Sequence, residues 1–142
     1  MALLNYTTQI DVEKTIHEIQ SCLGSHGAQK VMTDYDKGVI SAISFALNVN
    51  GKTIGFRLPC DWRPVLQILK DNPKVPRHLV DQTQAVRVAW RIVKDWVEAQ
   101  MALVETSMVK TEEVFLPYML TGKNETLYQQ IANTQFRLGD GK

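Results

Sequence analysis

The side chains best suited to chemistry in this sequence are arginines, and five of its six arginines stand in the middle third of the chain. Residues 52–94 hold nine basic and three acidic side chains, which gives this segment a net charge of +6. The preceding segment holds three basic and five acidic residues, and the following segment four and seven. Guanidinium groups bind phosphates and carboxylates through paired hydrogen bonds. The charge placement therefore predicts an anion site or a surface for an acidic partner.

The predicted contact set combines cations from several elements with one aromatic neighbour. Arg87 and Arg91 stand four residues apart on the exposed stripe of a long helix, near its N-terminus, where the helix dipole adds to the attraction for anions. The predicted ligand-binding residues are Arg57, Trp62, Arg63, Arg87, Arg91 and Lys94. The alternative is that these charges scatter over separate faces, or pair with the acidic segments, and only keep the protein soluble.

Patterns for catalysis or metal binding are weaker. Cys22, His26, Cys60 and His78 contain the ligand types of a Cys₂His₂ zinc site, but their spacing lacks paired C-x-x-C elements. Cys60 begins a helix whose dipole would lower its pKa, so a nucleophile–base pair with His78 or His17 is an alternative. The simpler interpretation of Cys60 is a small apolar residue between sheet and helix. We therefore expect no enzyme activity, no metal and no cofactor.

Composition places the chain among globular proteins. It has 142 residues, of which 44% are hydrophobic and 22% charged, and this size is typical of one domain, residues 1–142. No stretch approaches the roughly 18 apolar residues of a membrane span. The opening residues lack the basic and long apolar regions of a secretory signal. Two cysteines form no disulfide framework, so we expect a cytoplasmic protein.

The first half of the chain predicts a helix followed by an antiparallel meander. Asp11 is suited to cap a helix whose apolar residues recur every three or four positions up to Leu23. Alternation with period two then covers residues 31–35, 39–49 and 53–58. Asn50-Gly51 is a strong signal for a two-residue hairpin. Residues 3–9 are a possible fourth strand, so the sheet has three or four strands.

The second half predicts helices. One begins near Asp61, and the longest spans about residues 82–108 behind the cap Asp81. A turn or two follows at Thr111, and a last short helix lies near residues 126–136. The long helix is apolar on more than half its circumference, so we expect it to pack across one face of the sheet. Its other side requires the C-terminal elements or a second subunit. The predicted class is α+β, with an N-terminal helix and a long C-terminal helix on an antiparallel sheet.

Three segments, FRLP at 56–59, RVAWRIVKDWVEAQ at 87–100 and EVFLPY at 113–118, carry a resemblance to a known family. Residues 2–8 and 126–128 follow the same pattern, so the resemblance covers essentially the whole chain. The sequence resembles a family of short, uncharacterised proteins encoded by bacteriophages and prophages. This resemblance implies a phage protein that acts in the cytoplasm of a bacterial host, and it implies no mechanism.

These observations together predict a non-catalytic binding protein. The favoured function is a stoichiometric counter-defence inhibitor that binds a host bacterial protein or sequesters a phosphate-bearing nucleotide, acting as a homo-oligomer. The alternative is an accessory DNA- or RNA-binding protein in phage recombination or replication, and a cysteine or zinc enzyme comes third. Replacement of Arg87 and Arg91 by glutamate is expected to abolish binding of nucleic acid or nucleotide without unfolding the protein.

Overall fold

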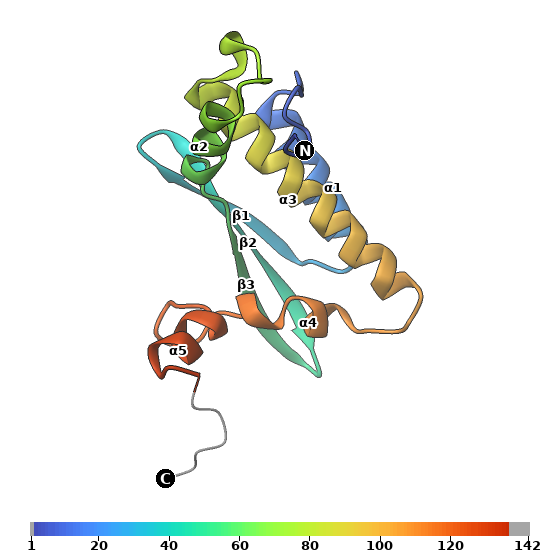
Figure 1. Cartoon of the computed structure of the whole chain (residues 1–142). Helices are drawn as coiled ribbons and strands as arrows, with labels where there is room; N and C mark the ends of the chain where they lie inside the picture. The colour runs from blue at the N-terminus through green and yellow to red at the C-terminus, as the bar shows by residue number, and fades with distance from the viewer. Residues whose placement is uncertain (1, 137–142) are drawn as a thin grey trace.

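The first half of the chain forms one helix and a three-stranded antiparallel meander (Figure 1). The computed structural model describes residues 2–136. Helix α1 spans Val12–Ser25, and the strands β1 (Lys30–Asp36), β2 (Val39–Val49) and β3 (Lys52–Pro59) pair in the order β1-β2-β3. Residues 3–9 form turns and an extended lead-in, so the possible fourth strand is not formed there.

The second half of the described chain is helical, and it confirms the predicted α+β class. Its elements are α2 (Arg63–Asp71), the 3₁₀ turn η1 (Arg77–Leu79), α3 (Gln82–Glu105), α4 (Thr111–Val114), the 3₁₀ turn η2 (Leu116–Tyr118) and α5 (Leu127–Asn133). Asp81 caps α3 as predicted, because its side chain accepts a hydrogen bond of 2.8 Å from the Gln84 backbone. Within residues 2–136 no helix has both the length and the apolar character that crossing a membrane requires.

Local sequence signals account for the β2–β3 hairpin. Asn50 and Gly51 both have positive φ, 53° and 86°, which a two-residue type I′ turn requires. Ile43, Phe45 and Leu47 alternate along β2 and are buried, as the period of two predicts. The predicted alternation is interrupted at Ser41. At Ser41 the pairing between β1 and β2 shifts by one residue, so the start of β2 departs from a regular pleat.

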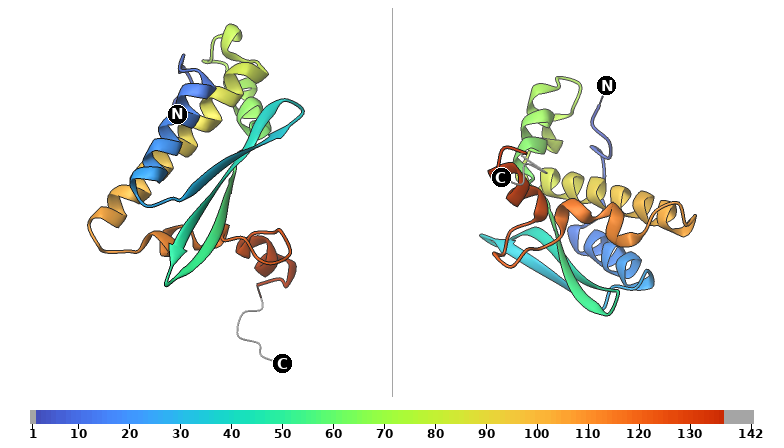
Figure 2. Two further views of the ribbon diagram at one scale, coloured as in Figure 1. Left: turned by 180° about the vertical axis from the view of Figure 1, so that it is seen from behind. Right: turned by 90° about the horizontal axis from the view of Figure 1, so that it is seen from below.

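Helices α1 and α3 lie side by side against the sheet and run in the same direction (Figures 1 and 2). Trp90 on α3 is buried, and its indole nitrogen donates a hydrogen bond of 3.2 Å to the Ile40 carbonyl oxygen on β2. An aromatic cluster fills the core between the layers. The Phe45 and Phe56 rings stack with centroids 5.3 Å apart, and Phe115 meets Phe45 edge-on at 5.1 Å.

The second apolar side of α3 is covered in part by the chain itself. The ring of Trp96 packs edge-on against Phe115 and Tyr118, with centroids 5.6 and 5.7 Å apart. Near the start of α3, Ala85 is buried in a small cluster with Leu69 of α2. The C-terminal elements, one of the two coverings expected for this side of α3, therefore contribute to it. The apolar character of α3 gives no independent reason for a second subunit.

The Phe56→Ala variant tests the aromatic core. Because Phe56 is fully buried and stacked on Phe45, its truncation is expected to lower the free energy of unfolding by about 3–5 kcal/mol. Urea denaturation followed by circular dichroism measures this loss. The exposed Met108→Ala is the matched control and should change the free energy little. Equal effects of the two variants would contradict this packing.

Candidate functional site

The six predicted ligand-binding residues lie in three separate places. Arg87, Arg91 and Lys94 stand on α3, where they pair with nearby carboxylates. Trp62 and Arg63 line a cleft where β3 passes into α2. Arg57 lies on the face of the sheet that α1 and α3 leave open. The six residues therefore form no single patch. This arrangement agrees with the alternative stated above, in which the basic residues scatter over separate faces or pair with acidic residues.

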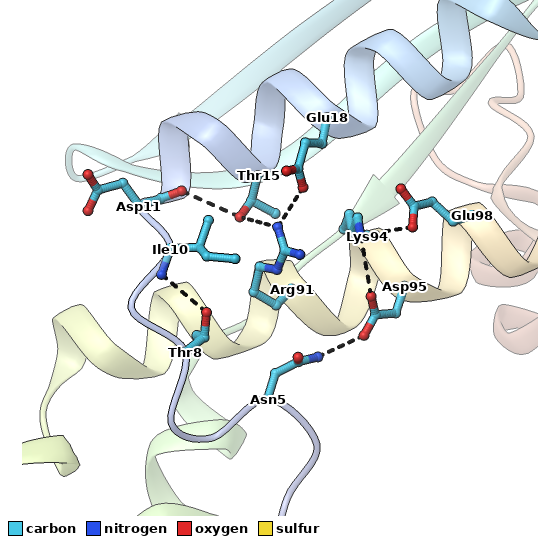
Figure 3. A network of polar contacts seen from close by, with 10 residues as sticks. All are labelled: Asn5, Thr8, Ile10, Asp11, Thr15, Glu18, Arg91, Lys94, Asp95 and Glu98. Carbon is cyan, nitrogen blue, oxygen red and sulfur yellow. Dashed lines mark hydrogen bonds and ion pairs between the residues drawn. The ribbon is translucent and has the colours of Figure 1, made fainter.

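Arg91 is held between α1 and α3 instead of lying on an exposed stripe. Its guanidinium donates hydrogen bonds to the Glu18 carboxylate at 2.5 Å and to the Thr15 hydroxyl at 3.3 Å (Figure 3). The side chain is only 11% exposed. The prediction of exposure is wrong because the spacing of four residues aligns Arg87 and Arg91 on the face of α3 that α1 covers. Replacement of Arg91 by glutamate would therefore disturb the contact between α1 and α3, so this variant does not report on ligand binding alone.

The other two cations of α3 also have carboxylate partners. Arg87 lies 3.3 Å from Asp11 at the start of α1. The Lys94 ammonium lies 2.8 Å from Glu98 and 3.7 Å from Asp95 (Figure 3). Asp95 in turn accepts a hydrogen bond of 2.8 Å from the Asn5 amide, which ties the N-terminal lead-in to α3. These cations connect segments of the chain to one another.

His26 closes the far end of the contact between α1 and α3, although the sequence indicates no partner for it. One ring nitrogen lies 2.8 Å from the Cys22 carbonyl oxygen and the other 2.8 Å from the Glu105 carboxylate. The hydrogen bonds to Cys22 and Glu105 raise the pKa of His26 above its ordinary value of 6.5. The imidazolium form therefore stabilises the folded state.

A cleft of about 590 Å³ opens at the end of the sheet, next to the β3–α2 junction. We call it the corner cleft. It is lined by Asp36, Lys37, Val39, Ile40, Ser41, Pro59, Cys60, Asp61, Trp62, Arg63 and Gln82. Its volume lies within the range of about 300–1,000 Å³ that is typical of small-molecule sites. It is larger than the groove of about 340 Å³ beside Arg57 on the open face of the sheet.

Charged groups of both signs line the corner cleft. Asp61 receives two hydrogen bonds from the Arg63 side chain, at 2.9 and 3.0 Å, and one from the Arg63 backbone. These bonds lower the pKa of the Asp61 carboxyl group. The Arg63 side chain is nevertheless 74% exposed, so it can turn toward a ligand. Asp36 at the end of β1 and Lys37 in the turn after it contribute one further charge of each sign.

Rigid elements support the walls of the cleft. Trp62 is half-buried and packs against both hydrophobic clusters of the protein, while part of its side chain lines the cleft. The Cys60 backbone nitrogen donates a hydrogen bond of 2.9 Å to the Ser41 carbonyl oxygen, which joins the end of β3 to β2. Gln82 brings the first turn of α3 to the cleft, and the positive end of a helix dipole favours anions.

The Cys60 thiol is not activated. It is buried, and burial together with the nearby Asp61 charge raises its pKa to about 12. The pKa lowering expected from a helix start is therefore wrong, because Cys60 precedes α2, which begins at Arg63, and its burial disfavours the thiolate. No group of three or more His, Cys, Asp or Glu side chains in residues 2–136 is arranged to hold a metal ion.

Arg57 lines a second, smaller groove of about 340 Å³ on the open face of the sheet. Its guanidinium donates hydrogen bonds to the side-chain and backbone oxygens of Asn124, at 3.3 and 3.2 Å. The groove runs over the small residues Ser44, Ala46 and Gly55. This arginine fastens the loop after η2 to β3 and does not reach the corner cleft.

Of the residues that line the corner cleft, the predicted ligand-binding set contained only Trp62 and Arg63, and the polar residues that it missed include Asp36, Lys37, Ser41, Asp61 and Gln82. Asp36 and Lys37 were interpreted only as parts of a turn. The order of the strands could have indicated that this turn lies beside the cleft. In a meander, the turn before the second strand lies beside the end of the third strand, so this turn and the β3–α2 junction must share one end of the sheet.

No known family model, no curated protein and no solved structure matches this chain.

The Arg91→Met variant tests the contact between α1 and α3. It leaves the Glu18 carboxylate without its cation, so the free energy of unfolding should fall by about 1–3 kcal/mol in urea denaturation. The double variant Arg91→Met with Glu18→Leu should recover most of this loss, because the unpaired and partly buried carboxylate is then absent. The control is Arg63→Met, whose ion pair with Asp61 is exposed, and it should leave stability unchanged. Equal losses in Arg91→Met and Arg63→Met would refute the structural role of Arg91.

His26 predicts a dependence of stability on pH. Because its pKa is higher in the folded than in the unfolded protein, its contribution is complete below about pH 6.5 and disappears as the pH rises through the folded pKa. Melting temperatures of the wild type and of His26→Gln, measured at about pH 5.5 and about pH 8.5, should differ more at the lower pH. A difference that stays constant between the two pH values would contradict the protonated pair with Glu105.

Proposed function

We propose that this chain is a non-catalytic binding protein that sequesters a phosphate-bearing nucleotide in the corner cleft. In view of the resemblance to phage proteins, the sequestered ligand is a nucleotide used by the bacterial host, and the protein acts as a counter-defence inhibitor. The observation that carries this proposal is the meeting of Trp62 and Arg63 in a cleft large enough for such a ligand.

The lining residues supply the kinds of contact that a nucleotide needs. The Trp62 side chain offers an aromatic surface for a base. The exposed guanidinium of Arg63, with Lys37 and the first turn of α3, offers positive charge for a phosphate. Asp36 and Ser41 offer hydrogen-bond partners for the sugar or the base.

Sequestration is favoured over turnover because the thiol that the sequence offers as a nucleophile at this cleft is not activated. Cys60 remains a thiol at neutral pH, since its pKa is about 12. Nucleic-acid binding is less well supported. Affinity for nucleic acid depends on many phosphate contacts, whereas Arg87, Arg91 and Lys94 are already paired with carboxylates of the same chain.

Thermal unfolding in the presence of a nucleotide panel tests the proposal. The probes are mono-, di- and triphosphates of adenosine and guanosine together with their cyclic forms, and the phosphate-free nucleosides are the controls. A nucleotide at about one hundred times its Kd should stabilise the fold by about 2.7 kcal/mol and raise the melting temperature. The nucleosides should shift it far less.

Variants then assign the binding to the corner cleft. Arg63→Gln should weaken nucleotide binding about tenfold in isothermal titration, because a charge-assisted contact to phosphate is lost. The matched control is Arg77→Gln, an exposed arginine outside the cleft, which should bind as the wild type does. The proposal fails if no nucleotide raises the melting temperature at millimolar concentration, or if the two variants bind equally well.

A further inference from the structure

Strand β1 forms an open edge of the sheet. At the opposite edge, β3 is covered by the segment after η2, where the Leu120 backbone donates a hydrogen bond of 2.8 Å to the Gly55 carbonyl oxygen. In the part of the chain that the structure describes, β1 pairs only with β2. The outer row of backbone donors and acceptors on β1 is therefore available to another strand.

The exposed side chains of β1 include two large hydrophobic ones. The Met32 side chain is 60% exposed and the Tyr35 side chain 64% exposed, in a strand of seven residues. Lys30, Met32 and Asp34 share the open face of the sheet, where all three line the groove beside Arg57. Val31, on the other face, packs against the hydrophobic core. Backbone and side chains at this edge together form an unpartnered surface.

We propose that the occupant of this edge is a second copy of the chain, paired antiparallel through β1 about a two-fold axis at Thr33. This pairing joins two three-stranded sheets into one of six strands. A two-fold axis perpendicular to the sheet keeps each face continuous and places Thr33 of one copy opposite Thr33 of the other. Residues at equal distances before and after Thr33 then become cross-strand partners.

In this register the sequence KVMTDYD of β1 pairs favourably at its ends and at its centre, while Met32 of each copy lies opposite Asp34 of the other. Lys30 of each copy lies opposite Asp36 of the other, which gives two pairs of opposite charge. Val31 lies opposite Tyr35, a β-branched residue against an aromatic one, and the two Thr33 side chains meet at the axis. All three are favourable pairings across antiparallel strands. The two Met32 side chains are diagonal neighbours on the open face and within reach of each other.

Charge complementarity favours a second copy over an unrelated strand. Isolated charges on an edge strand discourage pairing with foreign strands, because they face uncharged or like-charged neighbours. Here each terminal charge of β1 finds its opposite when the partner strand is a second copy of β1. The partner's Lys30 would also offset Asp36, one of the two carboxylates that line the corner cleft.

A charge-exchange series tests the interface by light scattering and sedimentation over a range of protein concentrations, without any nucleotide. The wild type should dimerise. Lys30→Asp and Asp36→Lys should each raise the dissociation constant about tenfold, because like charges then face each other twice. The double variant that carries both exchanges should dimerise as the wild type does, since opposite charges face each other again.

This rescue separates the interface from any effect within one chain. Lys30 and Asp36 stand six residues apart on the same strand, about 20 Å, so they do not contact each other in a single copy. Lys52→Asp, at the exposed start of β3, is the matched control and should leave dimerisation unchanged. Circular dichroism of each variant verifies the fold. A wild type that stays monomeric, or single variants that dimerise as strongly as the wild type, would overturn the proposal.

Discussion

The ion pair of Arg91 with Glu18, largely enclosed between α1 and α3, is the contact on which the placement of the other elements depends. The two helices run side by side in the same direction, and the whole sheet and α2 separate them in the chain. No short connection therefore sets their alignment. A guanidinium withdrawn from water requires a carboxylate, and this requirement limits how α1 can slide or rotate against α3. His26 with Glu105 repeats the constraint at the far end.

This use of charge changes how the arginine-rich middle third is understood. In sequence, Arg87 and Arg91 have the spacing of a binding stripe on a helix surface. In the fold they face a neighbouring helix that carries Asp11 and Glu18, so their charges are satisfied before any ligand arrives. The uneven charge of the three segments thus serves in part to join them. Only cations outside this contact, above all the exposed Arg63, remain suited to an external anion.

The corner cleft owes its shape to the hydrophobic core beneath it. Trp62 touches both clusters, so the wall that it forms is fixed by the same packing that attaches α2 to α3 and to the main core. The backbone bond between Cys60 and Ser41 anchors the junction to β2. A binding site on such rigid elements is organised before its ligand arrives, and this lowers the conformational cost of binding. The same burial that supports the wall keeps the Cys60 thiol protonated.

The sequence by itself determined the features that depend on neighbouring residues. The Asn50-Gly51 turn, the Asp81 cap and the buried alternation around Phe45 follow from backbone sterics and from the period of a strand, and all are present. Only the tertiary structure decided that Arg91 is enclosed. Because α3 is apolar around more than half its circumference, several of its polar residues border a buried face, and periodicity does not select which of them a partner helix covers. Which polar residue is covered depends on contacts between residues more than seventy positions apart, and the local sequence pattern gives no information on the energies of such contacts.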